Sequence, residues 1–407
     1  MTTTINASTT AGLVQTADTS GVLALQTAGT TAVSISASQV VTLTNALAEA
    51  SGGTGTTVGY NGFKNRIING AMVIDQRNAG ASVTGNNAVF GTDRFRIAGT
   101  QTSKLTMQQN AGSITPPSGF KNYLGVTSSS AYSVLAGDYF LVGQPVEGFN
   151  TYDLGFGASG ASTITLSFWV RSSLTGTFGG SINNSAYDRS YPFSYTISTA
   201  NTWEQKSVTI AGDTTGTWIG ATNGVGLYAW FNLGTGSTGS ATANAWAAGS
   251  YYAPTGATSI VGTNGATFYI TGVQLEKGST ATSFDYRPYG TELALCQRYF
   301  WRNKSGGSGA SLGVGYLATA TIFRSYAQFP VSMRAAPTFT VVTDGGNLII
   351  NTATGNIAIT TTGGTFNTDS GCVSLDMGSS GTAGQGAVIY SGGGSANAAY
   401  LQFSSEL

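Results

Sequence analysis

Four side chains in two β-like runs have the chemistry to hold a ligand: Trp169 and Arg171 in one run, Tyr228 and Trp230 in the other. In each run these residues alternate with aliphatic ones, so they face away from the apolar side of a strand. If both runs belong to one sheet, the rings form a stacking platform with a guanidinium beside it, suited to sugar hydroxyls or an acidic sugar. The alternative is that this aromatic face packs on a neighbouring subunit or domain.

Acid-base chemistry is restricted because the chain contains no histidine. This excludes Ser-His-Asp and Cys-His nucleophiles and any His-ligated zinc. Glycan cleavage by two carboxylates, about 5 to 10 Å apart, is the remaining enzymatic route. The candidate pairs include Asp138 with Glu147 and Asp188 with Glu204. Among 17 acidic residues, however, some pairs will lie close together by chance. We therefore expect these carboxylates to have structural or ion-pairing roles and the protein not to be an enzyme. A structural calcium ion is an open alternative that no local motif identifies.

The composition is unusually poor in charge. Only 8% of the 407 residues are charged, the net charge is zero, and glycine contributes 58 residues. We therefore expect no attraction to nucleic acid or to an anionic membrane. Cys296 and Cys372 lack neighbours at metal-ligand spacing, which favours buried small apolar side chains. No apolar run approaches the roughly 18 residues that span a bilayer, and the first residues lack the basic start of a signal peptide, so we expect a protein kept on the soluble side of a membrane.

Residues 1–58 form a segment of small polar residues with sparse aliphatic ones. Leu23 with Leu25, and Val33 with Ile35, show the alternation of half-buried strands, and residues 44–50 are a candidate short helix. The segment contains no aromatic side chain. A segment with so few large side chains cannot form a core that stabilises it alone. Its apolar face must therefore be buried against other copies of the segment or against another protein. We predict an oligomerisation and anchoring segment.

Residues 59–295 carry aromatic-rich strands at the spacing of a β-sandwich. In the last of these strands the apolar parity changes at Gly272, which predicts a β-bulge there. The clearest alternating runs are 162–173, 191–197, 225–233 and 267–275.

Residues 296–407 contain further short strands and predict a smaller C-terminal β-sandwich. A helix is expected at 291–299, where Leu295 and Tyr299 are four residues apart and Thr291 is the candidate N-cap. The predicted fold class is therefore all-β in three parts: the N-terminal segment, a central sandwich and a C-terminal sandwich.

Several long runs resemble a known family. They are similar, in order, to the tail fibres and virion appendages of tailed bacteriophages, whose central domain is a jelly roll. The runs are Phe63–Arg77, Thr92–Phe95, Phe268–Gly278, Phe284–Pro288, Glu292–Phe300 and Phe329–Thr338. The jelly roll also resembles carbohydrate-binding modules, most clearly at Leu166–Arg171 and Asn201–Glu204.

This resemblance implies a structural virion protein, made in the host cytoplasm, that contacts host surface glycans and assembles as a homotrimer. It implies that the N-terminal segment attaches the protein to other virion proteins. It also suggests that the runs holding Trp169 and Trp230 belong to one sheet. Two alternatives stay open: a purely architectural head-fibre, neck or capsid-decoration protein without glycan binding, and a glycan depolymerase.

Overall fold

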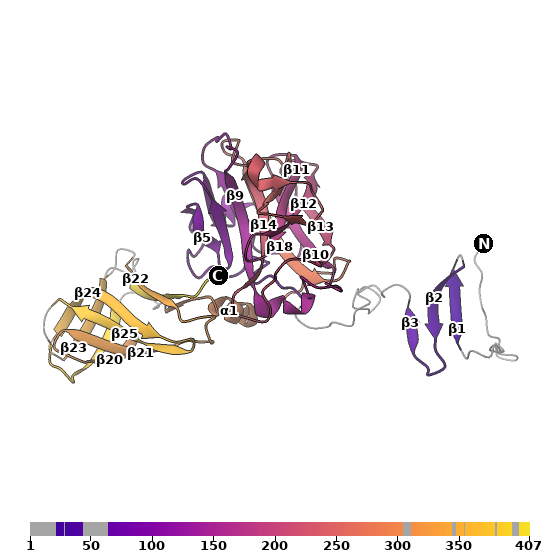
Figure 1. Ribbon diagram of the computed structural model, residues 1–407. Coiled ribbons are helices and arrows are strands. Elements are labelled where there is room, and N and C mark those ends of the chain that lie inside the picture. The colour runs from indigo at the N-terminus through magenta and orange to yellow at the C-terminus, as the bar shows by residue number, and fades with distance from the viewer. Residues whose placement is uncertain are drawn as a thin grey trace. The chain divides into compact units, whose positions relative to one another are not determined.

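The computed structural model (Figure 1) describes residues 22–27, 29–43, 64–303, 311–343, 347–353, 355–378, 381–392 and 399–407. The chain divides into two compact units, Met1–Gly62 and Phe63–Leu407. Nearly all regular structure is β, so the all-β prediction is confirmed. The boundaries at 58 and 295 stay predictions: the first lies outside the described residues, and the second falls inside the larger unit. No helix in the described part of the chain has the length and apolar character to span a bilayer.

The N-terminal unit contains one antiparallel sheet of β1 (Leu23–Thr27), β2 (Thr30–Ile35) and β3 (Val41–Leu43), as the alternation predicts for the first two strands. Its register pairs apolar residues across the strands, and cross-strand partners share a face. One face is therefore wholly aliphatic, carrying Leu23, Leu25, Val33, Ile35, Val41 and Leu43. Four of these side chains are 39–60% exposed within the described chain. The helix expected at 44–50 lies outside the described residues.

The larger unit begins with a β-sandwich, as predicted. Its six-stranded sheet has the order β13-β10-β18-β8-β7-β4, and its seven-stranded sheet has the order β16-β12-β11-β14-β9-β6-β5. The first sheet comprises β13 (Glu204–Ile210), β10 (Ile164–Ser172), β18 (Thr267–Lys277), β8 (Leu124–Ser128), β7 (Leu105–Gln109) and β4 (Val83–Thr84). The second comprises β16 (Ala247–Ala248), β12 (Arg189–Ile197), β11 (Gly176–Asn183), β14 (Val225–Thr235), β9 (Tyr139–Glu147), β6 (Phe95–Gly99) and β5 (Asn87–Thr92). Two short strands, β15 (Ser240–Ala241) and β17 (Ala253–Pro254), pair in parallel beside them.

The sandwich core lies between the inner faces of the two sheets. Phe168 of β10 meets Phe231 of β14 edge to face, with ring centroids 4.9 Å apart. The alternation therefore identified the inward residues of both strands, except that Val225, also expected on the apolar face, is only partly buried and lies outside the core. They are Ile164, Leu166, Phe168 and Val170 on β10, and Leu227, Ala229, Phe231 and Leu233 on β14.

Gly272 lies at a β-bulge, as its parity change predicts. Trp169 pairs with Thr271 and Ser167 with Gln274, so β18 has one extra residue between these partners. Gly272 has a φ of +61°, which favours glycine, and an added Cβ would lie 2.6 Å from the Phe120 ring.

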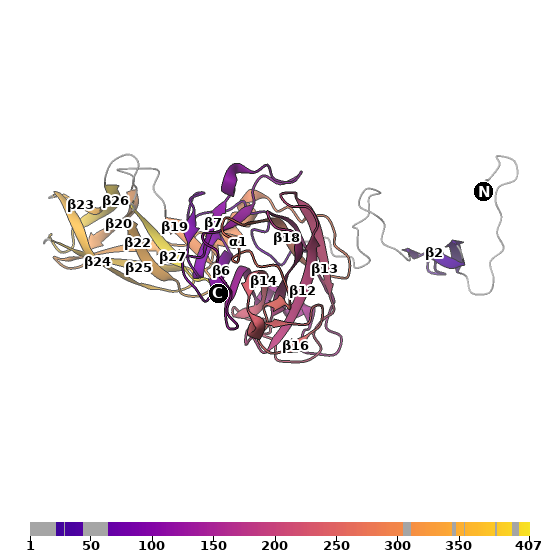
Figure 2. The ribbon, with the colours of Figure 1, turned by 90° about the horizontal axis from the view of Figure 1, so that it is seen from above.

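The C-terminal strands form a closed barrel and a small sheet. Six strands close in the order β20-β21-β25-β24-β23-β26, and β19, β27 and β22 make a separate three-stranded sheet. A sandwich was predicted here, but the hydrogen bonds between β20 and β26, about 75 residues apart in sequence, close the sheet on itself. The barrel strands are β20 (Ser311–Leu317), β21 (Ile322–Gln328), β23 (Asn347–Thr352), β24 (Gly355–Phe366), β25 (Ser370–Met377) and β26 (Gly386–Gly392). The small sheet contains β19 (Phe300–Asn303), β22 (Thr338–Thr343) and β27 (Ala399–Ser404), and in Figures 1 and 2 these C-terminal strands are orange to yellow.

The expected helix is α1 (Tyr289–Gln297), which connects the sandwich to β19. It begins two residues earlier than predicted, after Pro288, and no side chain caps its first turn. Thr291 therefore lies inside the helix and is not its N-cap. Pro288 ends the preceding extended segment, and its fixed φ allows the helix to begin directly after it.

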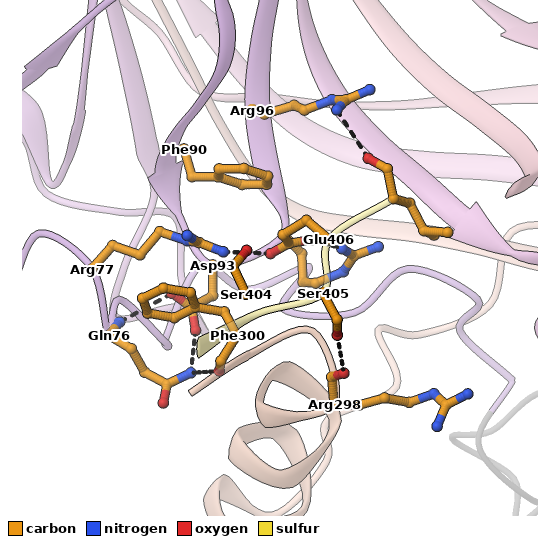
Figure 3. A network of polar contacts seen from close by, with 12 residues as sticks. Gln76, Arg77, Phe90, Asp93, Arg96, Arg298, Phe300, Ser404, Ser405 and Glu406 are labelled. Carbon is orange, nitrogen blue, oxygen red and sulfur yellow. Dashed lines mark hydrogen bonds and ion pairs between the residues drawn. The ribbon is translucent and has the colours of Figure 1, made fainter. Parts of the chain in front are cut away.

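The chain end after β27 is held against the sandwich by ion pairs and hydrogen bonds (Figure 3). Glu406 accepts hydrogen bonds from Arg77, at 2.6 Å, and from the buried guanidinium of Arg94. The Ser405 hydroxyl donates to the backbone carbonyl of Arg298 at 3.0 Å. Sandwich, helix and C-terminal sheet are thus joined around one carboxylate.

Residues of three segments far apart in the sequence, 63–77, 92–95 and 292–300, meet at this junction. Gln76 donates to the Asp93 carboxylate at 2.5 Å and to the Phe300 carbonyl at 2.9 Å. The side-chain amide of Asn69 donates to the carbonyls of Ile74 and Asp93, at 2.8 and 2.9 Å. Burial raises the pKa of Asp93 to about 7, although the neighbouring Arg77 lowers it. These residues therefore hold segments of the fold together.

Candidate functional site

The structure places the four predicted ligand residues on two different sheets. Trp169 and Arg171 belong to β10 of the six-stranded sheet, whereas Tyr228 and Trp230 belong to β14 of the seven-stranded sheet. Because the sheets share their inner faces, the two pairs point to opposite sides of the sandwich. The prediction of one joint platform is therefore wrong. Alternation identifies the outward face of each strand but not the sheet to which the strand belongs.

Tyr228 and Trp230 are covered by the protein's own rings. Trp230 is only 1% exposed, and its ring lies 5.6 Å from Tyr228 at an interplanar angle of 12°. Tyr187, from the loop between β11 and β12, stacks on Tyr228 at 4.7 Å and accepts a 3.3 Å hydrogen bond from the Trp230 indole nitrogen. Burial raises the pKa of Tyr187. Neither face of the Trp230 ring is open to a ligand.

Trp169 and Arg171 are partly exposed on the outside of the six-stranded sheet. Arg171 is held in place, because its Nε donates to the Asn201 carbonyl at 2.9 Å and its guanidinium lies 5.3 Å from the Tyr269 ring centre. On the neighbouring strand β13, the exposed Gln205 lies directly opposite Trp169. A ring, an oriented guanidinium and an amide thus share one accessible surface.

A second tryptophan extends this surface. Trp203 has the same parity as Gln205 and is half-buried, and its indole nitrogen donates to the Thr115 carbonyl at 2.9 Å. Its ring meets Tyr123 edge to face at 5.6 Å, which fixes its orientation. We refer to Trp169, Arg171, Trp203 and Gln205 as the Trp169 face. Trp203 and Gln205 were not predicted as ligand residues. Once β13 is known to pair with β10, counting outward positions along β13 identifies Gln205, and Trp203 lies just before this strand on the same parity.

The Trp169 face has the chemistry of a binding surface. Indole rings can stack on the apolar faces of sugar rings, and the guanidinium and amide supply directed hydrogen bonds. These four residues include no carboxylate, imidazole or thiol, which are common general acids and bases in enzymes.

The carboxylates of each candidate catalytic pair are too far apart to act together. Asp138 directly precedes the nine-residue strand β9 and Glu147 is its last residue. Asp188 and Glu204 lie near opposite ends of β12, which is also nine residues long. At about 3.3 Å per residue, each separation is about 30 Å, well beyond the roughly 10 Å that glycoside hydrolysis allows.

These four carboxylates have structural partners instead, as expected. Asp138 accepts hydrogen bonds from Thr100 and Tyr132, both at 2.7 Å, which lower its pKa to about 2. Glu204 pairs with Lys206 at 2.6 Å. Asp188 accepts a hydrogen bond from Asn184, and Glu147 binds Arg298 through both oxygens. That the chain is no enzyme stays a prediction.

The structure bears on the expected calcium ion and on the two cysteines in different ways. Among the described residues, no group of three or more His, Cys, Asp or Glu side chains could hold a metal ion, and the calcium ion stays a prediction. Cys296 is buried as predicted, and burial raises the pKa of its thiol, whereas Cys372 on β25 is only half-buried.

Comparison with known proteins finds similarity at the level of solved structures. No protein-family model matches the chain, and no curated protein does. The enzymatically active domain of tailspike protein 4 of bacteriophage CBA120 matches with 11% identity and a TM-score of 0.27, over 46% of this chain and 19% of that domain's chain. This chain therefore spans about a fifth of that protein.

Carbohydrate-binding modules match over about half of this chain. A family 4 module has 15% identity and a TM-score of 0.26, covering 52% of this chain and 98% of the module. The family 11 module of a Clostridium thermocellum cellulosomal cellulase has 8% identity and a TM-score of 0.24, covering 50% and 98%. Because identities and TM-scores are low, neither ligand binding nor catalysis follows from these similarities, which concern the arrangement of β-strands.

Proposed function

We propose that this chain is a structural virion protein of a tailed bacteriophage, an appendage that binds host surface glycans through the Trp169 face. The observation that carries the proposal is the partly exposed Trp169 beside an oriented Arg171. Sequence runs that resemble phage appendages, and that occur in the same order along the chain, support the virion role. In this proposal the protein is not an enzyme, and no cofactor takes part.

Glycan binding fits the Trp169 face because its groups are fixed before a ligand arrives. Arg171 is oriented by Asn201 and Tyr269, and Trp203 by Thr115 and Tyr123. Groups that are already oriented lose little conformational entropy on binding.

Self-association is the second part of the proposal. The aliphatic face of β1–β3 is a sheet surface that needs a covering layer, and none of its side chains is charged. We assign it to contacts between three copies of the chain, with other virion proteins attaching through the same N-terminal unit. Light scattering of the full-length chain tests this, and a stable monomer at micromolar concentration contradicts it.

A purely architectural role is the second candidate function. The burial of Trp230 and the stacking of Tyr228 between Trp230 and Tyr187 favour it, because two of the three aromatic residues that suggested a binding platform pack within the protein instead. In this reading the Trp169 face contacts a neighbouring virion protein.

One binding experiment separates these functions. Full-length wild type, Trp169→Ala and Tyr326→Ala are titrated with surface polysaccharide from the bacterial host. Tyr326 is 67% exposed on the barrel strand β21, so it is a matched control for losing an exposed ring. The proposal expects wild type and Tyr326→Ala to bind and Trp169→Ala to lose about tenfold or more in affinity, about 1.4 kcal/mol. No binding by wild type favours the architectural role, and release of reducing sugar contradicts the non-enzymatic assignment.

A further inference from the structure

An open groove of about 480 Å³ lies where the sandwich meets the C-terminal region. Sandwich loops supply Phe149 and Asn223, the end of helix α1 supplies Arg298, and the segment before β22 supplies Ser332, Met333 and Arg334. This volume falls within the range of about 300 to 1,000 Å³ that small-molecule sites occupy. The groove is separate from the Trp169 face, with which it shares no residue.

Hydrogen bonds join the two walls of the groove. Arg334 Nη1 donates to the Asn223 carbonyl at 2.9 Å, and Asn223 Nδ2 donates to the Arg334 carbonyl at 2.9 Å. The Arg334 amide also donates to the Arg298 carbonyl at 2.7 Å. The two bonds between Arg334 and Asn223 cross from one wall to the other, so the groove is formed before any ligand enters.

An aromatic ring stands open on one wall. Phe149 is 52% exposed, in the short 3-10 turn η3 (Gly148–Asn150). Its backbone amide donates to the Thr222 carbonyl at 2.9 Å, which holds the turn against the neighbouring loop. An exposed ring on a fixed backbone can stack on a flat apolar face of a ligand.

The charged side chains that line the groove are two guanidiniums. Arg298 binds both oxygens of Glu147, at 2.9 and 2.6 Å, and still leaves its side chain 30% exposed. Glu147 is 1% exposed and also accepts the Tyr299 hydroxyl at 2.5 Å, so its carboxylate is saturated beneath the groove.

Arg334 differs from Arg298, whose charge is balanced by Glu147: among the described residues Arg334 forms no ion pair. It makes its hydrogen bonds to the carbonyls of Asn223, Ser405 and Glu406, which are neutral acceptors. The nearby carboxylate of Asp369 accepts the hydroxyls of Ser332 and Thr368 and does not itself line the groove.

We propose that this groove binds a saccharide carrying a carboxylate, with Phe149 stacking on the sugar ring and Arg298 binding the acid. The inference rests on the glycan-binding function proposed above for the class of ligand. It adds a second site with a preference for acidic sugars.

The test uses matched pairs of methyl glycosides that differ only at the carboxylate. Glucuronide and glucoside, galacturonide and galactoside, and mannuronide and mannoside are titrated into the full-length chain, with binding followed by calorimetry and saturation-transfer NMR. We expect at least one uronide to bind about tenfold or more tightly than its neutral partner, about 1.4 kcal/mol, with an affinity that falls as salt rises.

Variants locate the site. Phe149→Ala removes an exposed ring without removing the backbone bond of its turn, so folding is preserved, and it should weaken uronide binding about tenfold. Arg298→Lys keeps the charge but loses the planar fork, and it should also weaken binding. Trp169→Ala and Tyr326→Ala should bind the uronide as wild type does, even if Trp169→Ala loses the host polysaccharide. Equal binding of neutral and acidic glycosides, no binding of any glycoside, or unchanged uronide binding by Phe149→Ala overturns the proposal.

Discussion

Arg334 and Asn223 exchange two hydrogen bonds of 2.9 Å across the junction between the sandwich and the C-terminal region. The same guanidinium donates to the carbonyls of Ser405 and Glu406, at 2.6 and 2.9 Å. One side chain therefore ties a sandwich loop to the chain end, and the rigidity of the groove depends on it.

Arg334→Met should destabilise the larger unit by about 2–4 kcal/mol, because Met keeps the length of the side chain and leaves three carbonyls without their donor. Urea unfolding of the full-length chain measures the change. Arg324→Met, at an exposed position of β21, is the control and should change stability by less than about 0.5 kcal/mol. If both substitutions lowered the free energy of unfolding equally, the stabilising role of the Arg334 hydrogen bonds would be contradicted.

Glu406→Gln should lower the free energy of unfolding by about 3–5 kcal/mol. The substitution leaves two largely buried guanidiniums, those of Arg77 and Arg94, without their shared counter-charge. A double-mutant cycle with Arg94→Met checks the cause. If Glu406 and Arg94 interact as the structure indicates, the double variant should be about 1–3 kcal/mol less destabilised than the two single effects predict together. If the destabilisations of the two single variants simply add up in the double variant, the Glu406–Arg94 ion pair does not contribute to stability.

Asp93 should make stability fall as pH rises from about 4 to about 7. Its pKa is raised to about 7 by burial in the folded state, and an unfolded aspartate titrates near 4, so only the folded protein holds the proton in this window. Arg77 opposes this shift and Glu406 adds to it. Asp93→Asn should flatten the profile between these pH values in denaturant titrations. A variant with the wild-type slope would assign the dependence to another group.

Asp138 should have the opposite effect at lower pH. Hydrogen bonds from Thr100 and Tyr132 lower its pKa to about 2, so its contribution is present above about 4 and is lost as pH falls through about 2. Asp138→Asn should remove this part of the acid destabilisation and leave the slope between pH 4 and 7 unchanged. Asp93→Asn and Asp138→Asn are controls for each other, because the pH ranges in which they should change stability do not overlap.

Trp230→Ala should destabilise the sandwich by about 3–5 kcal/mol, as expected for a large ring at 1% exposure. Trp169→Ala, on the half-exposed face, should cost at most about 1 kcal/mol. Thermal unfolding of both variants measures the difference. A small loss for Trp230→Ala would mean that its ring is free for a ligand after all.

The sequence by itself determined the features that depend on near neighbours along the chain. Strand period is two residues, so the inward set on β10 and β14 could be counted directly. The bulge at Gly272 followed from a parity change between Ile270 and Val273. A helix was predicted at 291–299, and α1 overlaps this range but begins and ends two residues earlier.

Only the tertiary structure decided which strands pair and what covers them. Trp169 and Trp230 have the same local pattern, yet β10 pairs with β13 and β18 while β14 pairs with β9 and β11, which places the rings on opposite sides of the sandwich. Tyr187 reaches Tyr228 from a loop some 40 residues away, and Arg334 reaches Asn223 over more than 100. Such pairings depend on the global balance of burial and hydrogen bonding, because a strand's own alternation is satisfied equally well in either sheet.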